Sequence, residues 1–402
     1  MRAEVSIPSR VYLDHAATSP MPAPVLAAYA DALSTVGNPA STHGHGQAAS
    51  ERLEEARERI AVALGCDPAE AVLTAGGTES INLALKGLYW ARRRACVGDG
   101  AGDAGGSAGS GPGPVLLIAN GEHHATLEAA EWLRDAQGAR VRWLPIDAAG
   151  LLQPQVLARA ISEEGAENIA LVSFLWANNE VGSVQAVAEL CAVAEKAGVP
   201  VHVDAVAALG QTAIDFRSSG ASALSVSAHK IGGPVGVGAL VLGRAAAADP
   251  LLHGGSQQRA RSGTQDVAGA IAFAAALDLV LEPGSVQPRS ALVAELRSRR
   301  DRLIAGVRAA VPDAVLRGSD PSSTDARLAG NAHFTFPGCQ GDSLVFLLDA
   351  AGISVSVGSA CTAGVAEISH VLPAMGVPEA EASGALRFTL GFDTSEAEVD
   401  AL

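Results

Sequence analysis

The sequence predicts an α/β fold, with a mainly parallel sheet in a large domain and a smaller second domain. Short apolar segments of strand type alternate with alanine-rich segments of helical spacing through most of the chain, which is typical of a parallel sheet covered by helices. Of the 402 residues, 48% are hydrophobic, enough for one large core and a second, smaller one. After Pro283 and Pro288 the pattern becomes richer in strands, which places a change of domain near Pro283.

In chain order, the expected strands are 71–74, 115–120, 169–174, 199–204 and 223–227. A helix is predicted over 48–64, because Leu53, Ile60 and Leu64 recur on one face and Gly65 supplies a stop. Residues 98–113 are nearly all Gly, Ser, Ala, Asp and Pro and predict a flexible surface insertion. A long helix is expected over 290–310. We therefore predict a large domain over 16–282 and a small domain formed by 1–15 together with 283–402.

The charge balance and the cysteine count exclude several classes of protein. With 28 Lys and Arg against 43 Asp and Glu, the formal charge is −15, whereas a direct nucleic-acid binder normally carries a basic face. No stretch approaches the roughly 20 apolar residues of a membrane span, and no leader is recognisable, so we expect a cytoplasmic protein without membrane contact. The five cysteines never form C-x-x-C, which argues against a disulfide framework and a zinc knuckle.

Lys230 lies at the end of the expected strand 223–227, where Ser227-Ala228-His229-Lys230 leads into the glycine-rich segment 232–238. A lysine at the end of a buried strand, before glycines that let the backbone approach a ligand, is suited to forming a Schiff base. The alternative is an ordinary loop lysine at the surface, and this segment alone favours neither interpretation.

A glycine turn at Gly76-Gly77-Thr78 connects the strand 71–74 to a helix. Free N–H groups and the positive end of the helix dipole can hold a phosphate at such a turn, although an isolated glycine turn is more often structural. The segment 256–264, with Arg259 and Arg261, either offers further anion donors or is a solvated surface loop.

Two polar residues are expected at the carboxyl ends of strands, which is the edge where open α/β sheets bind ligands. Asp204 ends Val201-His202-Val203-Asp204 and could keep a pyridine nitrogen protonated, or it could simply begin a turn. His123 follows the strand 115–120 and is a candidate acid, base or stacking ring. The two close histidine pairs of the chain lack the i, i+4 spacing of a helical zinc site, so we expect no metal site.

Cys361 stands in Gly358-Ser359-Ala360-Cys361-Thr362-Ala363-Gly364, where small residues and two glycines surround it. A cysteine in such an open loop can present its thiolate, and the segment alone leaves a functional and a structural role equally open. The other cysteines are interpreted differently. Packing residues are expected at Cys66, Cys191 and Cys339, and an exposed residue without a role is expected at Cys96.

Taken together, these segments resemble the cysteine desulfurases, pyridoxal-phosphate enzymes of the class V aminotransferase group. The resemblance runs from Tyr12-Leu13-Asp14-His15-Ala16-Ala17-Thr18 almost to the C-terminus, and the order of the motifs makes it specific. The other matching segments are Gly37-Asn38-Pro39-Ala40-Ser41, Gly76-Gly77-Thr78-Glu79-Ser80, Glu122-His123, Asn178-Asn179-Glu180-Val181-Gly182, His202-Val203-Asp204-Ala205, Ser227-Ala228-His229-Lys230, Arg261-Ser262-Gly263-Thr264, Gly358-Ser359-Ala360-Cys361 and Leu386-Arg387-Phe388.

The resemblance implies a fold-type I enzyme with a seven-stranded sheet and pyridoxal 5'-phosphate as cofactor. Lys230 would bind the cofactor as a Schiff base, Asp204 would pair with its ring nitrogen, and His123 would stack on the ring and move protons. Asn178 would contact the cofactor and, with Arg387, bind the substrate carboxylate. The phosphate would be held by Gly77, Thr78, Ser227 and His229, and by Thr264 of a neighbouring subunit in a homodimer.

The implied reaction converts L-cysteine to L-alanine. Cys361 would attack the substrate sulfur, hold it as a persulfide and pass it to a sulfur-acceptor protein. That acceptor is expected to be an iron–sulfur scaffold, a tRNA-thiolation enzyme or a dedicated pathway carrier. The alternatives are a selenocysteine lyase or an aminotransferase on the same fold, or a binding subunit that has lost catalysis.

Two departures from the family pattern stand out. The family usually has a glutamine that hydrogen-bonds the phenolic oxygen of the cofactor three residues after the aspartate, whereas this chain has Ala207. The chain also ends at Leu402 without the further helix and tail of the housekeeping iron–sulfur members, so a tRNA-thiolation enzyme or a pathway carrier is as plausible an acceptor as a scaffold.

Overall fold

The computed structural model describes residues 10–97, 113–323, 325–358 and 368–402, and its centre is a seven-stranded sheet. The strand order is β2-β8-β7-β6-β5-β3-β4, and all neighbours are parallel except β8, which is antiparallel to both β2 and β7. The strands are β2 (Ala71–Thr74), β3 (Val115–Ala119), β4 (Arg140–Leu144), β5 (Ile169–Leu175), β6 (Val201–Asp204), β7 (Ala223–Ser227) and β8 (Gly238–Leu242). The predicted α/β fold with a mainly parallel sheet is confirmed.

All five predicted strands are present, with ends that differ by no more than two residues, but β4 and β8 were not predicted. β4 is an edge strand in which Arg140 and Arg142 alternate with apolar residues, and both arginines pair with acids of the neighbouring helix. β8 begins at Gly238, the last residue of the glycine-rich segment 232–238, so the sequence has no strand pattern at its start.

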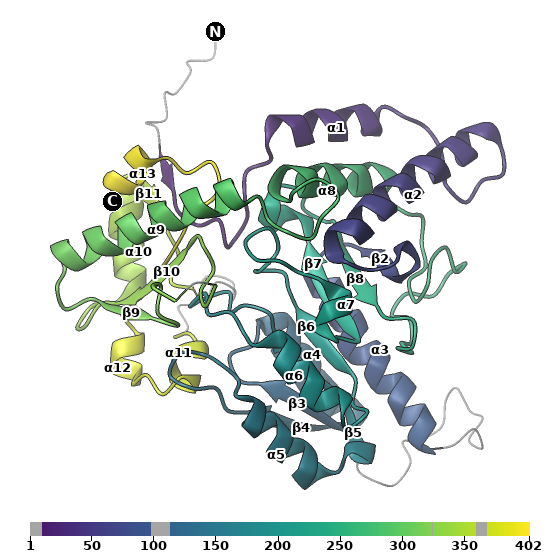
Figure 1. Cartoon of the computed structure of the whole chain (residues 1–402), viewed down its shortest axis with the longest axis horizontal. Coiled ribbons are helices and arrows are strands. Elements are labelled where there is room, and N and C mark those ends of the chain that lie inside the picture. Colours follow the sequence, from purple (N-terminus) through teal and green to yellow (C-terminus); the bar gives the residue numbers. More distant parts are fainter. Residues whose placement is uncertain (1–9, 98–112, 324, 359–367) are drawn as a thin grey trace.

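Helices cover both faces of this sheet, and each face has its own hydrophobic cluster (Figure 1). The helices are α1 (Ala23–Leu33), α2 (Gly44–Leu64), α3 (Gly77–Val97), α4 (His124–Gln137), α5 (Pro154–Glu164), α6 (Val187–Glu195), α7 (Phe216–Ser219) and α8 (Val267–Val280), with 3-10 turns at Pro68–Glu70, Ala166–Asn168 and Ala228–Ile231. Neighbouring residues of β3 point to opposite clusters, Leu117 to one and Leu116 to the other. The sheet is therefore buried on both sides.

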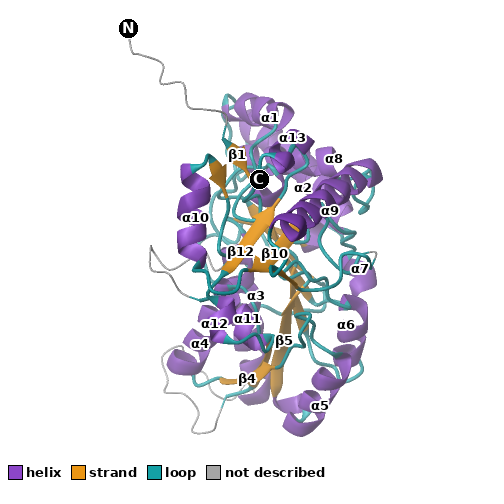
Figure 2. Cartoon of the chain, turned by 90° about the vertical axis from the view of Figure 1, so that its left-hand side faces the viewer, coloured by secondary structure: helices purple, strands orange, loops and turns teal. Residues whose placement is uncertain are grey.

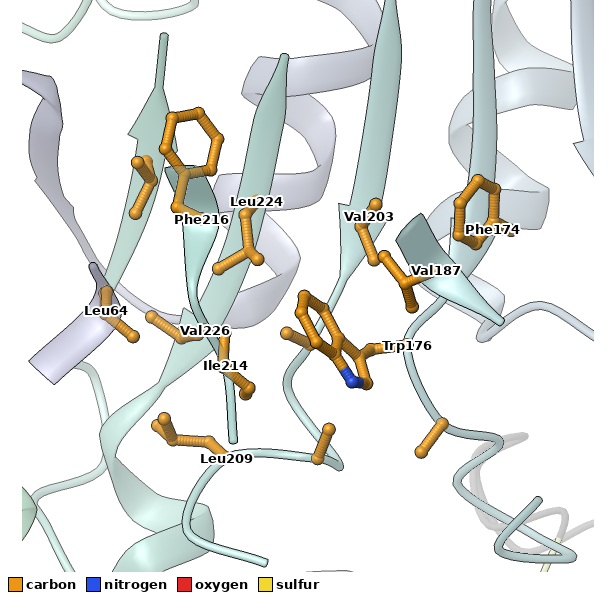
Figure 3. Packing of buried hydrophobic residues seen from close by; sticks show 14 of the residues in the cluster. Leu64, Phe174, Trp176, Val187, Val203, Leu209, Ile214, Phe216, Leu224 and Val226 are labelled. Carbon is orange, nitrogen blue, oxygen red and sulfur yellow. The ribbon is translucent and has the colours of Figure 1, made fainter. Parts of the chain in front are cut away.

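Figure 3 shows part of one of these clusters, in which Phe174, Val203 and Leu224 of three central strands belong to the same buried group as Trp176. Because these side chains are buried, the strand ends beneath the site are held rigidly. The predicted helix 48–64 is part of α2, which ends as expected at Gly65 with a left-handed φ of 65°.

A second region contains a three-stranded antiparallel sheet and a short parallel pair (Figure 2). Its strands are β1 (Val11–Tyr12), β9 (Val315–Arg317), β10 (Asn331–Thr335), β11 (Ile353–Ser354) and β12 (Ala385–Thr389), and its helices are α9 (Ser290–Ala310), α10 (Gly341–Ala350), α11 (Val371–Ala374), α12 (Glu379–Ala382) and α13 (Glu396–Asp400). The predicted helix 290–310 coincides with α9.

The N-terminal arm packs on this second region, because Leu13 belongs to the same hydrophobic cluster as Phe334, Phe388 and Val399. Val371, by contrast, belongs to a cluster of the large sheet. The division into 16–282 and 1–15 with 283–402 stays a prediction, and the predicted insertion 98–113 lies outside the described residues except for Gly113. Within the described parts of the chain, no helix combines the length and the apolar character needed to cross a membrane.

Candidate active site

A cavity of about 690 Å³ lies at the carboxyl ends of the parallel strands. Glu122 follows β3, Leu175 ends β5, Asp204 ends β6 and Ser227 ends β7, and all four contribute to its wall. The N-terminal arm and β12 form part of the opposite wall. The predicted site residues that line the cavity are Gly77, Thr78, His123, Asp204, Ser227, His229, Lys230 and Arg387.

Lys230 lies in the 3-10 turn that follows β7. Its Nζ donates to the carbonyl oxygens of Ala16 at 2.5 Å and Ala17 at 3.0 Å. Ser19 holds the same backbone turn, because its hydroxyl donates to the carbonyl of Lys230 at 3.0 Å. The lysine therefore lies between the sheet and the N-terminal arm, inside the cavity wall.

Asp204 is 2% exposed and lies at the floor of the cavity. Burial raises the pKa of its carboxyl to about 6, while the N–H of Val206 and the charge of Lys230 lower it. Oδ1 accepts from the Val206 N–H at 2.9 Å. A buried carboxylate with a raised pKa is stabilised by a cation placed beside it, so the floor of the cavity favours a positively charged ligand group.

The glycine turn at the start of α3 is closely packed against the end of β7 and the residues after β6. A Cβ on Gly77 would lie 2.8 Å from Cγ2 of Val206. A Cβ on Gly76 would lie 3.8 Å from the Ser227 hydroxyl oxygen. Because α3 has 21 residues and begins at Gly77, its free N–H groups and dipole face this wall of the cavity, which is suited to a phosphate.

His123 and His229 are both held as neutral rings. Burial, with a smaller effect of Lys230, lowers the pKa of each to about 4. His123 caps α4 by accepting the Ala125 N–H on Nδ1 at 3.1 Å, so the neutral ring carries its proton on Nε2. Nδ1 of His229 lies 3.3 Å from the hydroxyl of Thr18 in the N-terminal arm.

Arg387 brings a buried positive charge to the wall formed by β12. Its Nη2 donates to Oδ1 of Asp14 at 2.9 Å, and its Nη1 donates to the carbonyl of Asn179 at 3.0 Å. Nε is buried and has no hydrogen-bond partner among the described residues. The guanidinium therefore retains donors for an anion in the cavity.

Two described site residues of the prediction, Asn178 and Thr264, do not line the cavity. The Asn178 oxygen accepts from the N–H groups of Glu180 and Val181, each at 2.9 Å, and its nitrogen donates to Gly121 at 3.0 Å. Its neighbour Asn179 lines the cavity instead. Thr264 is exposed and away from this wall, and Cys361 lies outside the described residues.

Ala207 does line the cavity, so the usual glutamine position offers no donor there. Arg259 donates to the carbonyls of Leu242, Gly243 and Ala246, and Arg261 pairs with Glu79 at 3.0 Å. The Nη groups of Arg259 are thus used by backbone carbonyls and the Nε of Arg261 by a carboxylate, which disfavours Arg259 in particular as an anion donor.

Three acids for which the sequence predicts no role, Asp14, Glu122 and Glu180, lie beside the cavity or its arginine. Glu122 is 2% exposed, and burial, followed by the charge of Asp204, raises its pKa well above the usual range. The sequence pattern could have identified Glu122 as a site residue, because it is an acid that follows the strand 115–120, just as Asp204 is an acid at the end of a strand. For Asp14 and Glu180, only the motif in which each stands gave a hint.

Two of the three cysteines whose surroundings are described agree with a packing role. Cys66 and Cys191 are buried, and burial raises the pKa of each thiol to about 12. Cys339 is partly exposed. The side chain of Cys96 lies outside the described residues, as Cys361 does.

The geometry of the site agrees with what known proteins show. The family model of class-V aminotransferases matches residues 11–99 and 103–402. The chain belongs to the class-V aminotransferase family. A curated IscS-like cysteine desulfurase of Mycobacterium tuberculosis is 49% identical over 97% of this chain and 93% of its own length. A cysteine desulfurase IscS of Dictyoglomus turgidum is 36% identical over 97% of this chain and 92% of its own length.

Solved structures of similar sequence have the same fold as this class-V chain. A NifS-like protein superposes with a TM-score of 0.82 at 31% identity and covers 97% of this chain and 96% of its own. A structure described as SspA in complex with cysteine superposes with a TM-score of 0.75 at 29% identity, over 94% of this chain and 98% of its own. The predicted fold-type I architecture is confirmed.

Class-V enzymes of this kind depend on pyridoxal phosphate, and this protein is a pyridoxal-phosphate enzyme. The cavity fits the cofactor in three respects. A buried acid, Asp204, lines the cavity and would serve as the partner of a pyridine nitrogen. The turn at Gly77 has no room for a side chain, and Lys230 lies on the same wall as Ser227.

Proposed function

We propose that the protein is a cysteine desulfurase, which converts L-cysteine to L-alanine and holds the sulfur as a persulfide on Cys361 before passing it to an acceptor. The observation that carries this proposal is the convergence of Lys230, Asp204 and Arg387 on one cavity. An amine, a buried acid and a buried guanidinium are the groups that cofactor attachment, ring protonation and carboxylate binding require. Curated relatives with this name over nearly the whole chain support the same activity.

The cofactor is assigned to the floor and one wall of the cavity. When bound, pyridoxal phosphate supplies an electron sink that allows bonds at the α- and β-carbons of an amino acid to break. Lys230 would attach it covalently. Oδ1 of Asp204 accepts from a backbone N–H, so Oδ2 would pair with the ring nitrogen. Thr78, Ser227, His229 and the N–H groups at Gly77 would hold the phosphate.

The substrate is assigned to the wall that contains Arg387. The Nε–H and the remaining N–H groups of its guanidinium bind the carboxylate of L-cysteine, while Asp14 and the Asn179 carbonyl fix its orientation. With the cofactor bound, His123 would stack on its ring, and Nε2 would be the nitrogen that exchanges protons. Asn178 holds the turn that presents Asn179 to the cavity, because its side-chain oxygen accepts from the N–H groups of Glu180 and Val181.

In the sulfur-transfer step, the thiolate of Cys361 attacks the sulfur of the substrate. An S–S bond forms, the Cβ–S bond breaks, and the electron pair of that bond ends in a new C–H bond at Cβ of the product alanine. One cysteine and one enzyme thiol thus give one alanine and one enzyme persulfide. A sulfur-acceptor protein, such as a scaffold, a tRNA-thiolation enzyme or a pathway carrier, then removes the outer sulfur.

The first test of this proposal is chemical trapping of the cofactor. Borohydride reduction of the holoenzyme should fix pyridoxal phosphate on the peptide that contains Lys230, because reduction makes a lysine–cofactor link permanent. Peptide mapping by mass spectrometry locates the label. Labelling of another lysine would contradict the assignment, and the Lys230→Ala variant should carry none.

The second test separates the alternatives on the same fold. The purified enzyme is given L-cysteine, L-selenocysteine, or an amino acid with a keto acid, and alanine, sulfide, selenide and the transaminated product are measured. A desulfurase releases alanine and sulfide from cysteine in the presence of a thiol reductant. Turnover restricted to selenocysteine would identify a lyase, and amino-group transfer would identify an aminotransferase.

A further inference from the structure

The turn 178–182 comes shortly after β5 and brings Asn179 to the cavity wall. The carbonyl oxygens of its last four residues all accept hydrogen bonds from the second region of the molecule. The bonds run from Nη1 of Arg387 to Asn179 at 3.0 Å, from Nδ2 of Asn331 to Glu180 at 3.0 Å, from Nη1 of Arg327 to Val181 at 2.9 Å and from the N–H of Leu328 to Gly182 at 2.8 Å. The second region therefore holds this turn along its whole backbone.

Arg327 differs from the other donors because it brings a buried positive charge that does not line the cavity. It is 3% exposed, and besides Val181 it donates through Nε to the carbonyl of Ser319 at 2.9 Å and through Nη2 to the carbonyl of Arg317. All of these acceptors are neutral oxygens, and burial lowers the pKa of the guanidinium to about 10. Burial of a charge on neutral acceptors alone is costly, which favours a specific task over incidental packing.

Arg327 is connected to the substrate wall through the backbone of the turn. The carbonyl that it holds, in Val181, belongs to the second residue after Asn179. The Asn179 carbonyl accepts from Nη1 of Arg387 at 3.0 Å, and Asp14 accepts from Nη2 of the same guanidinium at 2.9 Å. Nε of Arg387 is buried and has no hydrogen-bond partner among the described residues. A displacement of the turn would therefore move one of the two contacts that orient this Nε–H.

We propose that Arg327 is a positioning residue for the carboxylate of the substrate. By holding the Val181 carbonyl, it fixes the turn that orients Arg387, and so sets the direction of the donors that bind this carboxylate. Charge-assisted hydrogen bonds depend on distance and angle, so a small displacement of the guanidinium weakens them. This inference rests on the proposed desulfurase function, which assigns the carboxylate of L-cysteine to Arg387.

The test compares Arg327→Met with Arg300→Met in the holoenzyme. Arg300 is a matched control, because it is 1% exposed and donates to the carbonyls of Leu328 at 3.1 Å and Pro321 at 3.5 Å, but to no residue of the turn 178–182. Each protein is titrated with L-alanine, the product, and with L-alaninamide, which has no anionic carboxylate. The absorbance change of the bound cofactor gives the dissociation constant of each ligand, and circular dichroism verifies the fold.

We expect the dissociation constant of L-alanine to rise by about tenfold in Arg327→Met and that of L-alaninamide to change by no more than about twofold, because only the carboxylate needs an oriented Arg387. Arg300→Met should bind both ligands as the wild type does. Equal weakening of the two ligands in Arg327→Met would overturn the proposal, because a general structural defect affects both. Unchanged affinity for L-alanine would overturn it as well.

Arg327→Lys is the milder variant, because lysine keeps the charge but loses the planar fork of donors that reaches several carbonyls at once. Its ratio of the two dissociation constants should lie between those of the wild type and Arg327→Met. If the methionine variant does not fold, this ratio decides, and a wild-type value would overturn the proposal. Failure of the desulfurase proposal is recognised separately, because the wild type would then release no alanine and sulfide from L-cysteine.

Discussion

Buried histidines link the stability of this protein to pH. His202 lies within the sheet, with its ring nitrogens 2.9 Å from the Ser173 hydroxyl and 2.8 Å from the Ser225 hydroxyl, and burial lowers its pKa to about 3. The pKa of His333 is likewise lowered to about 3. An unfolded histidine has a pKa of about 6.5, so below that pH the unfolded chain binds protons that the native chain excludes.

The expected result is a loss of stability as the pH falls from about 6.5 toward 3, by about 1.4 kcal/mol per pH unit for each such histidine. Urea unfolding of the holoenzyme at several pH values measures the slope, with and without His202→Gln. In the variant, the difference in bound protons between the unfolded and the native chain should be smaller by about one. A slope that is the same in both proteins would show that His202 is protonated in the native state.

The residues of the cofactor site could be assigned from sequence because each belongs to a short motif at the end of an apolar strand. Asp204, Ser227 and Lys230 all line the cavity as expected. The contacts of Asp14 and Glu180 could not be predicted, since their partners Arg387 and Ser369 are far away in the chain and approach only through tertiary folding. For Asn178 the motif identified the right loop, but Asn179 is the residue on the cavity wall.

The start of α3 is the element whose position most directly limits cofactor binding. Gly77→Ala would press a methyl group against Val206, which lies 2.8 Å from the added Cβ, and should displace the N–H groups that face the phosphate. We expect cofactor affinity to fall by about 1–3 kcal/mol, which is typical of overpacking. Absorbance titration of the apoenzyme with pyridoxal phosphate measures it.

Gly306→Ala is the matched control for this change. Gly306 is also a helical glycine, in α9, and its added Cβ has no atom within 4 Å. This control should bind the cofactor as the wild type does. Unchanged affinity in Gly77→Ala would show that the turn does not contribute to the phosphate site.

Among the elements, strands with a continuous apolar pattern could be predicted and those without one could not. β5 is buried at every position and stands out in the sequence. β4 is half exposed, and its apolar residues alternate with arginines. β8 begins within a glycine-rich segment. Neither strand therefore has the continuous apolar pattern that predicts a buried strand. Helix α9 could be placed to the residue because Pro288 precedes it and its apolar face repeats through the whole length.

For the whole molecule, the homodimer implied by the resemblance to the cysteine desulfurases predicts that each active site is built from two chains. Thr264 is exposed and does not line the cavity of its own chain, which agrees with a role at the phosphate of a partner. The exposed apolar side chains Leu26, Leu33 and Val36 in and after α1 provide surface that a second copy could cover.

Mixing Lys230→Ala and Thr264→Ala homodimers tests this arrangement. If Thr264 serves the partner, subunit exchange creates dimers with one intact site, and activity at limiting pyridoxal phosphate should rise above the mean of the two parents. If Thr264 serves its own chain, no intact site forms and the mixture stays at that mean. Size-exclusion chromatography with light scattering verifies the dimer in each sample.

The claim that Cys361 receives the sulfur is tested most directly by a single turnover of the holoenzyme with L-cysteine, without reductant. Intact-protein and peptide mass spectrometry should find one additional sulfur atom on the Cys361 peptide and one alanine formed per active site. Cys361→Ser should bind cysteine but gain no sulfur. Added sulfur on another cysteine, or full desulfurase turnover by Cys361→Ser, would contradict the account.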